Sequence, residues 1–222
     1  MTNTEATYAR WRALTRELIG GDEDLRRLQD LRYRYAAEVG RLLTRPGPDG
    51  RPVEGCVLYG VLSDGPGLLY VGQTTEAQRR LRDLAVGESH HLANTVPPEV
   101  WDRVIVVRWP DVLQQMQQAD REAVTSLPLS VVGEGLERLL QADLNPLLNS
   151  RRRIRDGNWR ERSTAHSRSR GAAAAQTVHP LHLQVRRVWW RLVSRPAVGS
   201  HHYQPDGRIV FPTQLLDGGL GS

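Results

Sequence analysis

VLYGVLSDGPGLLYVGQTTEAQRRLRDL, residues 57–84, contains two short apolar runs, a turn-rich linker between them and a polar segment after them. The runs are rich in aliphatic residues and each carries a tyrosine, and SDGPG between them is typical of a tight reversal of the chain. We therefore expect a β-hairpin. Thr75 opens a capping-box pattern, which predicts that a helix rich in arginine follows the second strand directly.

The hairpin belongs to a larger predicted unit at residues 54–150. A third strand is expected at 103–109, where RVIVVRW is apolar in its middle, and helices are expected at 111–122 and 133–143. This order predicts an α+β fold with a small three-stranded antiparallel sheet flanked by helices.

Residues 1–50 are expected to form a separate helical hairpin. Apolar residues recur there at helical spacing, and the Gly20-Gly21-Asp22 sequence marks the end of one helix and the start of another. Residues 151–222 are expected to form a basic C-terminal extension, with a short helix or strand around VWW and a strand-like RIVFP near the end.

Composition restricts the class of protein. The 222 residues are 39% hydrophobic and 25% charged, as in an ordinary globular protein, and no apolar run is long enough to span a membrane. The polar start MTNTEATYARW does not resemble a secretory signal, so a cytoplasmic location without a membrane partner is expected. The single cysteine, Cys56, excludes a disulfide framework and a cysteine-based zinc cluster.

Positive charge is concentrated in one part of the chain. Residues 151–195 contain twelve arginines against Asp156 and Glu161, a net charge of +10 in a chain whose total is +5. A localised basic segment is typical of a protein that binds a partner with many phosphates, because each phosphate that the protein neutralises releases a counterion. A solvated arginine-rich linker is the alternative. The expected DNA contacts are Arg151, Arg152, Arg153, Arg155, Arg160 and Arg162.

Tyr59 and Tyr70 occupy one predicted strand each. Pairing of the two strands brings such positions together on one face if the register allows, and the following helix would carry Arg80 past them. Tyrosine is also simply favoured in strands, which is the competing explanation.

The order of these residues resembles the GIY-YIG nuclease superfamily. Val57-Leu58-Tyr59 stands at its Gly-Ile-Tyr motif and Tyr70-Val71-Gly72 at its Tyr-Ile-Gly motif, and the similarity covers about residues 54–150. The matching residues, in chain order, are Tyr59, Tyr70, Arg80, His90 or His91, Glu137 and Asn149.

The resemblance implies a Mg²⁺-dependent hydrolase of DNA phosphodiester bonds, with Mn²⁺ able to substitute. Glu137 would be the metal ligand, since Mg²⁺ binds through one or two carboxylates together with water and substrate phosphate. One of Tyr59 and Tyr70 would receive the proton of the attacking water, with His90 or His91 as the relay.

Two further roles follow from the same resemblance. Arg80 would hold the scissile phosphate through its two-pronged guanidinium group. Asn149 would fix the geometry of the site through hydrogen bonds, although a simple helix-end cap explains it too.

The sequence departs from the family pattern at three places. Val57 replaces the first motif glycine, and Gln73 stands where some relatives carry a lysine that helps the tyrosine lose its proton. About twenty extra residues precede the Glu137 helix, so Glu134, one turn earlier, stays open as the metal ligand.

These departures leave other functions open. The chain is expected to be an endonuclease, with restriction or defence as one setting and repair or a mobile element as others. An inactive DNA-binding module on the same scaffold is the alternative. The N-terminal helices also leave room for a homodimer.

Overall fold

The computed structural model describes residues 3–65, 67–87, 92–153, 159–161 and 169–217, with only the course of the backbone for 150–153, 159–161 and 217. The elements in chain order are α1 (Asn3–Leu18), α2 (Asp22–Thr44), β1 (Val57–Ser63), β2 (Gly67–Thr74), α3 (Ala77–Asp83), α4 (Leu92–Thr95), η1 (Pro98–Val100), β3 (Arg103–Val107), α5 (Trp109–Gln114), α6 (Gln118–Thr125), α7 (Leu129–Leu144), α8 (Leu147–Ser150), β4 (Arg151–Arg153), β5 (Trp159–Glu161), α9 (Arg170–Val193), β6 (His201–Gln204), β7 (Gly207–Val210) and α10 (Pro212–Asp217).

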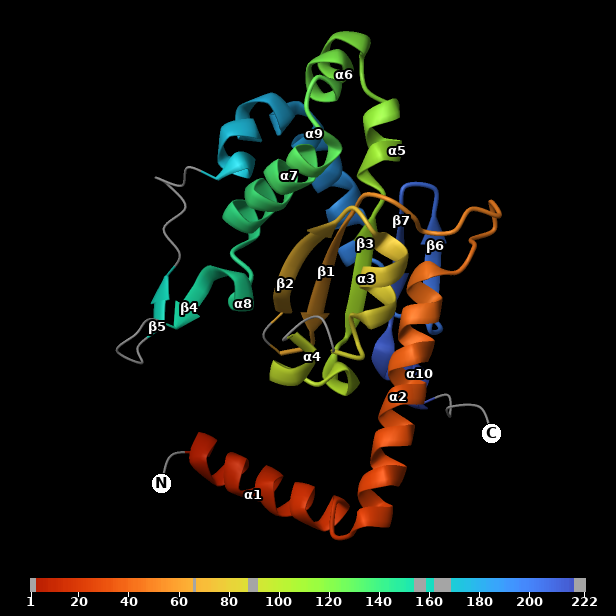
Figure 1. Cartoon of the computed structure of the whole chain (residues 1–222), viewed down its shortest axis with the longest axis vertical. Coiled ribbons are helices and arrows are strands. Elements are labelled where there is room, and N and C mark those ends of the chain that lie inside the picture. The colour runs from red at the N-terminus through yellow and green to blue at the C-terminus, as the bar shows by residue number, and fades with distance from the viewer. Residues whose placement is uncertain (1–2, 66, 88–91, 154–158, 162–168, 218–222) are drawn as a thin grey trace.

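The main sheet is antiparallel and, within the described residues, has five strands in the order β2-β1-β3-β7-β6. The α+β fold therefore has a larger sheet than the sequence predicted, and the expected three-stranded sheet is wrong. β6 and β7 form a hairpin that pairs with β3, so the C-terminal residues complete the sheet that residues 57–107 begin (Figure 1). β4 and β5 form a separate two-stranded ribbon.

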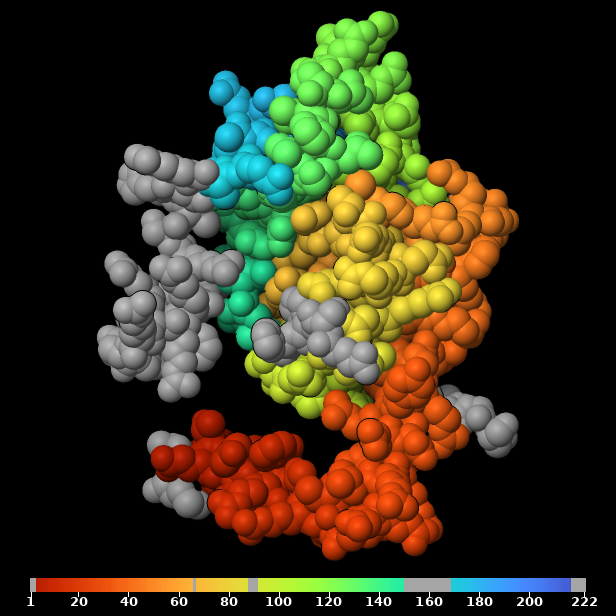
Figure 2. Space-filling view, viewed as in Figure 1, coloured from red at the N-terminus to blue at the C-terminus, as the bar shows by residue number. Residues whose placement is uncertain are grey.

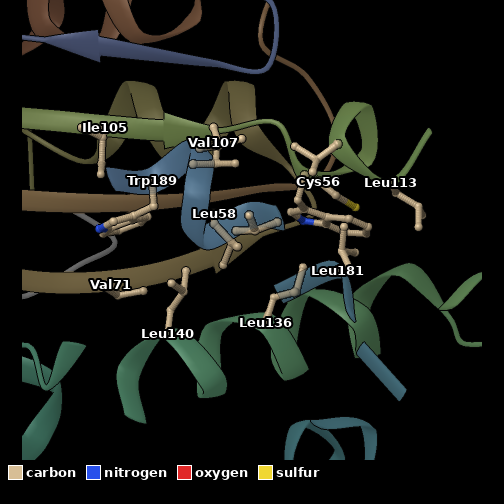
Figure 3. Close-up of a cluster of buried hydrophobic side chains, with 14 of the residues drawn as sticks. Cys56, Leu58, Val71, Ile105, Val107, Leu113, Leu136, Leu140, Leu181 and Trp189 are labelled. Carbon is tan, nitrogen blue, oxygen red and sulfur yellow. The ribbon is translucent and has the colours of Figure 1, made fainter. Parts of the chain in front are cut away.

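Helices cover both faces of the main sheet, because the strands are apolar on both sides. On one face Leu58, Val71 and Ile105 pack against α7 and α9, and Figure 3 shows Leu136 and Leu140 of α7 directed at this cluster. Side chains of alternate strand residues, such as Tyr59 and Val106, face α2 and α3 instead. Strands buried on both faces read as continuous apolar runs, as β1 and β3 do.

Close packing fixes the layers at two glycines. A side chain at Gly60 would come within 2.3 Å of Trp189, whose ring lies over β1 from α9. A side chain at Gly40 would come within 2.8 Å of the backbone of Arg82, which shows how closely α2 approaches α3. The second contact sets the position of the helix that carries Arg80.

Two helical regions differ from the sequence-based expectation. The predicted helix 111–122 is divided into α5 and α6. The segment 170–193, expected to be basic and irregular at its start, is a single 24-residue helix, α9. Ser169 caps α9 by accepting a hydrogen bond from the backbone N–H of Ala172, and Pro180 lies inside the helix.

The N-terminal helices do not form a packed hairpin. The C-terminal half of α2 is buried against the body through Tyr35, Val39 and Leu43, whereas α1 has no buried residue. Figure 1 shows α1 turning away from α2 at the base of the molecule. In the described parts of the chain, no helix is both long and apolar enough to cross a bilayer.

Candidate active site

Tyr59 and Tyr70 lie side by side on the α3 face of the sheet. The register pairs Tyr59 with Gly72 and Val61 with Tyr70, so both side chains point to the same face from neighbouring strands. Their ring centroids are 6.0 Å apart. A β-carbon at Gly72 would lie 2.6 Å from the Tyr59 hydroxyl and 2.7 Å from the Tyr70 ring. The glycine of the second motif therefore provides the space that both rings occupy.

Arg80 reaches this tyrosine pair from α3. Its Nε donates a hydrogen bond to the Tyr59 hydroxyl at 3.1 Å, and its side chain is partly buried. Its neighbours on the helix have other contacts: Arg79 pairs with Glu76 at the surface, and Arg82 approaches the Thr44 hydroxyl at 3.5 Å. Of these three arginines, Arg80 is thus the one that contacts a predicted catalytic residue.

Burial and charge act on the two phenols differently. Burial raises the pKa of both Tyr59 and Tyr70, and the charge of Glu137 raises both further. Arg80 opposes this at Tyr59, where its charge and hydrogen bond lower the pKa. The hydrogen bond between the two hydroxyls lowers the pKa of Tyr59 and raises that of Tyr70, as expected when Tyr70 is the donor. The arrangement favours negative charge on Tyr59 over Tyr70.

Glu137 approaches the pair from α7, on the opposite side of β2. Its Oε1 accepts a hydrogen bond from Nε2 of Gln141 at 2.9 Å, and the same Nε2 donates to the carbonyl oxygen of Val71 at 3.1 Å. β2 is the edge strand of the main sheet, so the carbonyl group of Val71 points outward, away from β1. Gln141 therefore connects the carboxylate to the strand that carries Tyr70.

Asn149 binds the other backbone group of the same residue. Its Oδ1 accepts a hydrogen bond from the N–H of Val71 at 2.7 Å, and the side chain is buried. An edge strand leaves backbone groups unpaired on its outer side, and here two side chains satisfy both groups of Val71. Asn149 thus holds β2 in place next to Tyr70.

Glu134 has a different environment from Glu137. Its carboxylate forms an ion pair with Arg170 at the start of α9. No effect of Glu134 on either phenol is found among the described residues, whereas Glu137 affects both. The geometry thus favours Glu137 over Glu134 as the carboxylate of the site.

Gln73 lies on the other face of β2 from the tyrosines. A side chain at Gly133 of α7 would come within 2.9 Å of its Oε1, so this glutamine fills the space between β2 and α7. The residue at the position of the family's lysine is therefore a packing contact.

Several predicted residues lie where the structure gives no side-chain description. His90 and His91 are outside the described residues, and so are Arg155 and Arg162. The side chains of Arg151, Arg152, Arg153 and Arg160 are not described either, although β4 and β5 place the backbone of these four in a ribbon.

The donor set suits a hard cation bound largely by water and substrate. Among the described residues there is no group of three or more His, Cys, Asp or Glu side chains close enough to hold a metal ion. Glu137 contributes one carboxylate, with one oxygen oriented by Gln141. Mg²⁺ commonly binds through so few protein ligands, so these residues fit it, whereas they do not fit structural zinc.

Gln141 is the residue of this site that sequence reasoning missed. It follows Glu137 by one helical turn, which is the spacing of side chains that meet on one face of a helix. The spacing can be read from the sequence. The role of Gln141 depends on Val71 lying in an edge strand with an unpaired carbonyl, and only the folded chain reveals that position.

Comparison of the chain with protein-family models, with curated proteins and with solved structures gave no match.

Proposed function

We propose that this protein is a Mg²⁺-dependent endonuclease that hydrolyses DNA phosphodiester bonds through a site of the GIY-YIG type. The observation that carries the proposal is the hydrogen bond from Arg80 to Tyr59, in a cluster that also includes Tyr70 and the carboxylate of Glu137. These residues come from four separate segments of the chain, and the resemblance names all four.

The two tyrosines act as one unit for the proton of the attacking water. Tyr70 is the partly exposed member, whereas Tyr59 is fully buried behind it. Water therefore contacts Tyr70, and its proton passes along the hydrogen bond between the hydroxyls toward Tyr59, where Arg80 favours negative charge. Because burial raises the pKa of both phenols, the rate should increase with pH in the alkaline range.

Arg80 has a second role at the phosphate. A guanidinium group offers several N–H donors, so one directed at Tyr59 leaves others for phosphate oxygens. Charge increases on these oxygens in the transition state, and the bonds strengthen there.

Glu137 would hold the Mg²⁺ ion. When bound, the ion would neutralise charge on the phosphate and activate the water. The chain's own contribution is the orientation of the carboxylate, which Gln141 keeps at the edge of β2.

An inactive DNA-binding module is the second candidate. The packing of Gln73 against Gly133 favours the inactive module. Gln73 faces away from the tyrosines, so it does not help them lose a proton as the lysine of some relatives does. On either proposal the basic residues 151–162 contact the DNA backbone and the protein acts in the cytoplasm. The setting, defence, repair or a mobile element, rests on analogy.

Cleavage of plasmid and linear duplex DNA tests the proposal. Purified protein is incubated with Mg²⁺, with Mn²⁺ and with chelator, beside Glu137→Ala and the matched control Glu134→Ala. We expect discrete metal-dependent fragments, a loss of at least roughly 100-fold for Glu137→Ala and near-normal cleavage for Glu134→Ala. If the wild type shifts DNA in a gel but cuts none under any metal condition, the module is correct and the nuclease is rejected.

A further inference from the structure

α1 carries an apolar stripe that the described chain leaves uncovered. Tyr8, Trp11, Leu14 and Leu18 are each more than half exposed, at 61%, 55%, 59% and 55%. Their spacing of three and four residues places them on one side of the helix. Figure 2 shows α1 projecting from the base of the molecule as an arm.

The stripe continues on the first half of α2. Leu25 and Leu31 are 51% and 46% exposed, although they belong to the same apolar face as Tyr35 and Val39, which are buried against the body. The face of α2 is thus longer than the surface of this chain that it packs against.

A helix in this state needs a partner. α1 has 16 residues and none of them is buried, so packing within the described chain adds little to its stability. Isolated helices of about this length are marginal in water, since most helix stability in proteins comes from packing of the apolar face. DNA does not suit the stripe, because Arg10, Arg12 and Arg16 lie beside it and not on it.

We infer that the arm, meaning α1 together with the exposed first half of α2, binds the arm of a second copy of this chain across a two-fold axis. The stripe runs along α1 with Trp11 near its middle. Packing the two stripes face to face therefore places the two Trp11 side chains at the centre of the interface and buries the apolar residues that this chain leaves uncovered.

The available area agrees with a stable dimer. The exposed apolar residues of α1, of the turn after it and of the first half of α2 are Tyr8, Trp11, Leu14, Leu18, Ile19, Leu25 and Leu31. At on the order of 100 Å² each they contribute about 700 Å² per copy, close to the roughly 800 Å² that each partner contributes to a standard interface.

Light scattering coupled to size exclusion tests this on the full chain. The wild type is expected at twice the monomer mass of 25.0 kDa. Leu14→Glu/Leu18→Glu should give the monomer mass with an unchanged melting temperature, because the stripe is outside the core. The matched control Ala9→Glu/Ala13→Glu adds the same charges on the opposite side of α1 and should stay a dimer.

Oxidative cross-linking then tests which faces of the two α1 helices meet. In a Cys56→Ser background, Trp11→Cys should form a disulfide-linked dimer and Ala13→Cys should not. A wild type that is monomeric at about 100 µM, or a Leu14→Glu/Leu18→Glu variant that stays dimeric, would overturn the inference. Either result leaves the nuclease proposal intact, because no residue of the tyrosine site lies on the arm.

Discussion

Gln141 and Glu137 are joined by a 2.9 Å hydrogen bond on α7, and the same amide of Gln141 lies 3.1 Å from the carbonyl oxygen of Val71 on β2. One side chain thus fixes the distance between the carboxylate of the site and the strand that carries Tyr70. If Glu137 holds the metal ion as proposed, Gln141 is the group that orients it, and loss of such a group typically costs about 10–100-fold in metal affinity or activity.

Gln141→Met should therefore weaken metal use without unfolding the protein. We expect the Mg²⁺ concentration for half-maximal cleavage to rise by about 10-fold or more, because the carboxylate loses its fixed orientation. The melting temperature should fall only slightly, because methionine keeps the packing volume while the edge carbonyl of Val71 loses one donor. Gln118→Met is the matched control, since Gln118 makes a similar bond to Glu122 on α6, outside the tyrosine site. An unchanged Mg²⁺ dependence for Gln141→Met would mean that Gln141 only packs.

Gly72→Ala should separate the two tyrosines. The new β-carbon would lie 2.6 Å from the Tyr59 hydroxyl and 2.7 Å from the Tyr70 ring, so at least one ring must move. Overpacking of this kind costs about 1–3 kcal/mol of unfolding free energy, and we expect cleavage to fall with it. Gly65→Ala is the control, because a side chain at Gly65 meets no atom within 4 Å. Chemical denaturation of both variants measures the difference; equal stability would show that the site has room to adapt.

The buried phenols predict a loss of stability at high pH. Burial raises the folded-state pKa of Tyr70 and of Tyr35 above that of an exposed tyrosine. Their contribution to stability is thus fully present below about pH 10 and is lost as pH rises through the folded pKa, by at most about 1.4 kcal/mol per pH unit for each group.

Tyr70→Phe and Tyr35→Phe should each flatten this decline, measured as unfolding free energy against pH from 9 to 12. Tyr35→Phe also loses the 2.9 Å hydrogen bond to the carbonyl oxygen of Pro98, so its curve should start lower. Because Tyr35 lies outside the tyrosine site, a flatter slope in both variants assigns the effect to burial. A slope equal to the wild type in both would contradict the assignment.

The tyrosine cluster could be predicted from the sequence only in part. Both strands and the helix of Arg80 follow from local patterns, but the register shifts by one residue between Val61 and Leu62. Without this irregularity Tyr70 would pair with Gly60 and point away from Tyr59, and the sequence does not reveal it. The helix of Arg80 follows directly on β2. Glu137 and Asn149 could be placed only through the family resemblance, since both are distant in sequence from the strands that they contact.

The larger sheet was missed because its last two strands are short and far along the chain. β6 has the sequence HHYQ, which has little strand character. It pairs with β7 across Pro205-Asp206, a turn signal that is readable in the sequence. α9 was not predicted as one helix because its first residues were assigned to the basic segment before it, although apolar residues such as Val178, Leu181 and Val185 keep helical spacing. Tertiary packing against α7 outweighs the proline.

Arg80→Gln should change both the rate and its pH dependence. The substitution removes the hydrogen bond and the positive charge that lower the pKa of Tyr59, so that pKa rises and less of the phenol is ionised at any given pH. The alkaline increase in the cleavage rate should therefore move to higher pH, with a loss of roughly 100-fold at neutral pH because the phosphate contact is lost as well. Arg79→Gln is the control, since Arg79 pairs with Glu76 at the surface of the same helix. A uniform loss with an unshifted pH profile would show that Arg80 acts on the phosphate alone and that Tyr59 does not take up the proton.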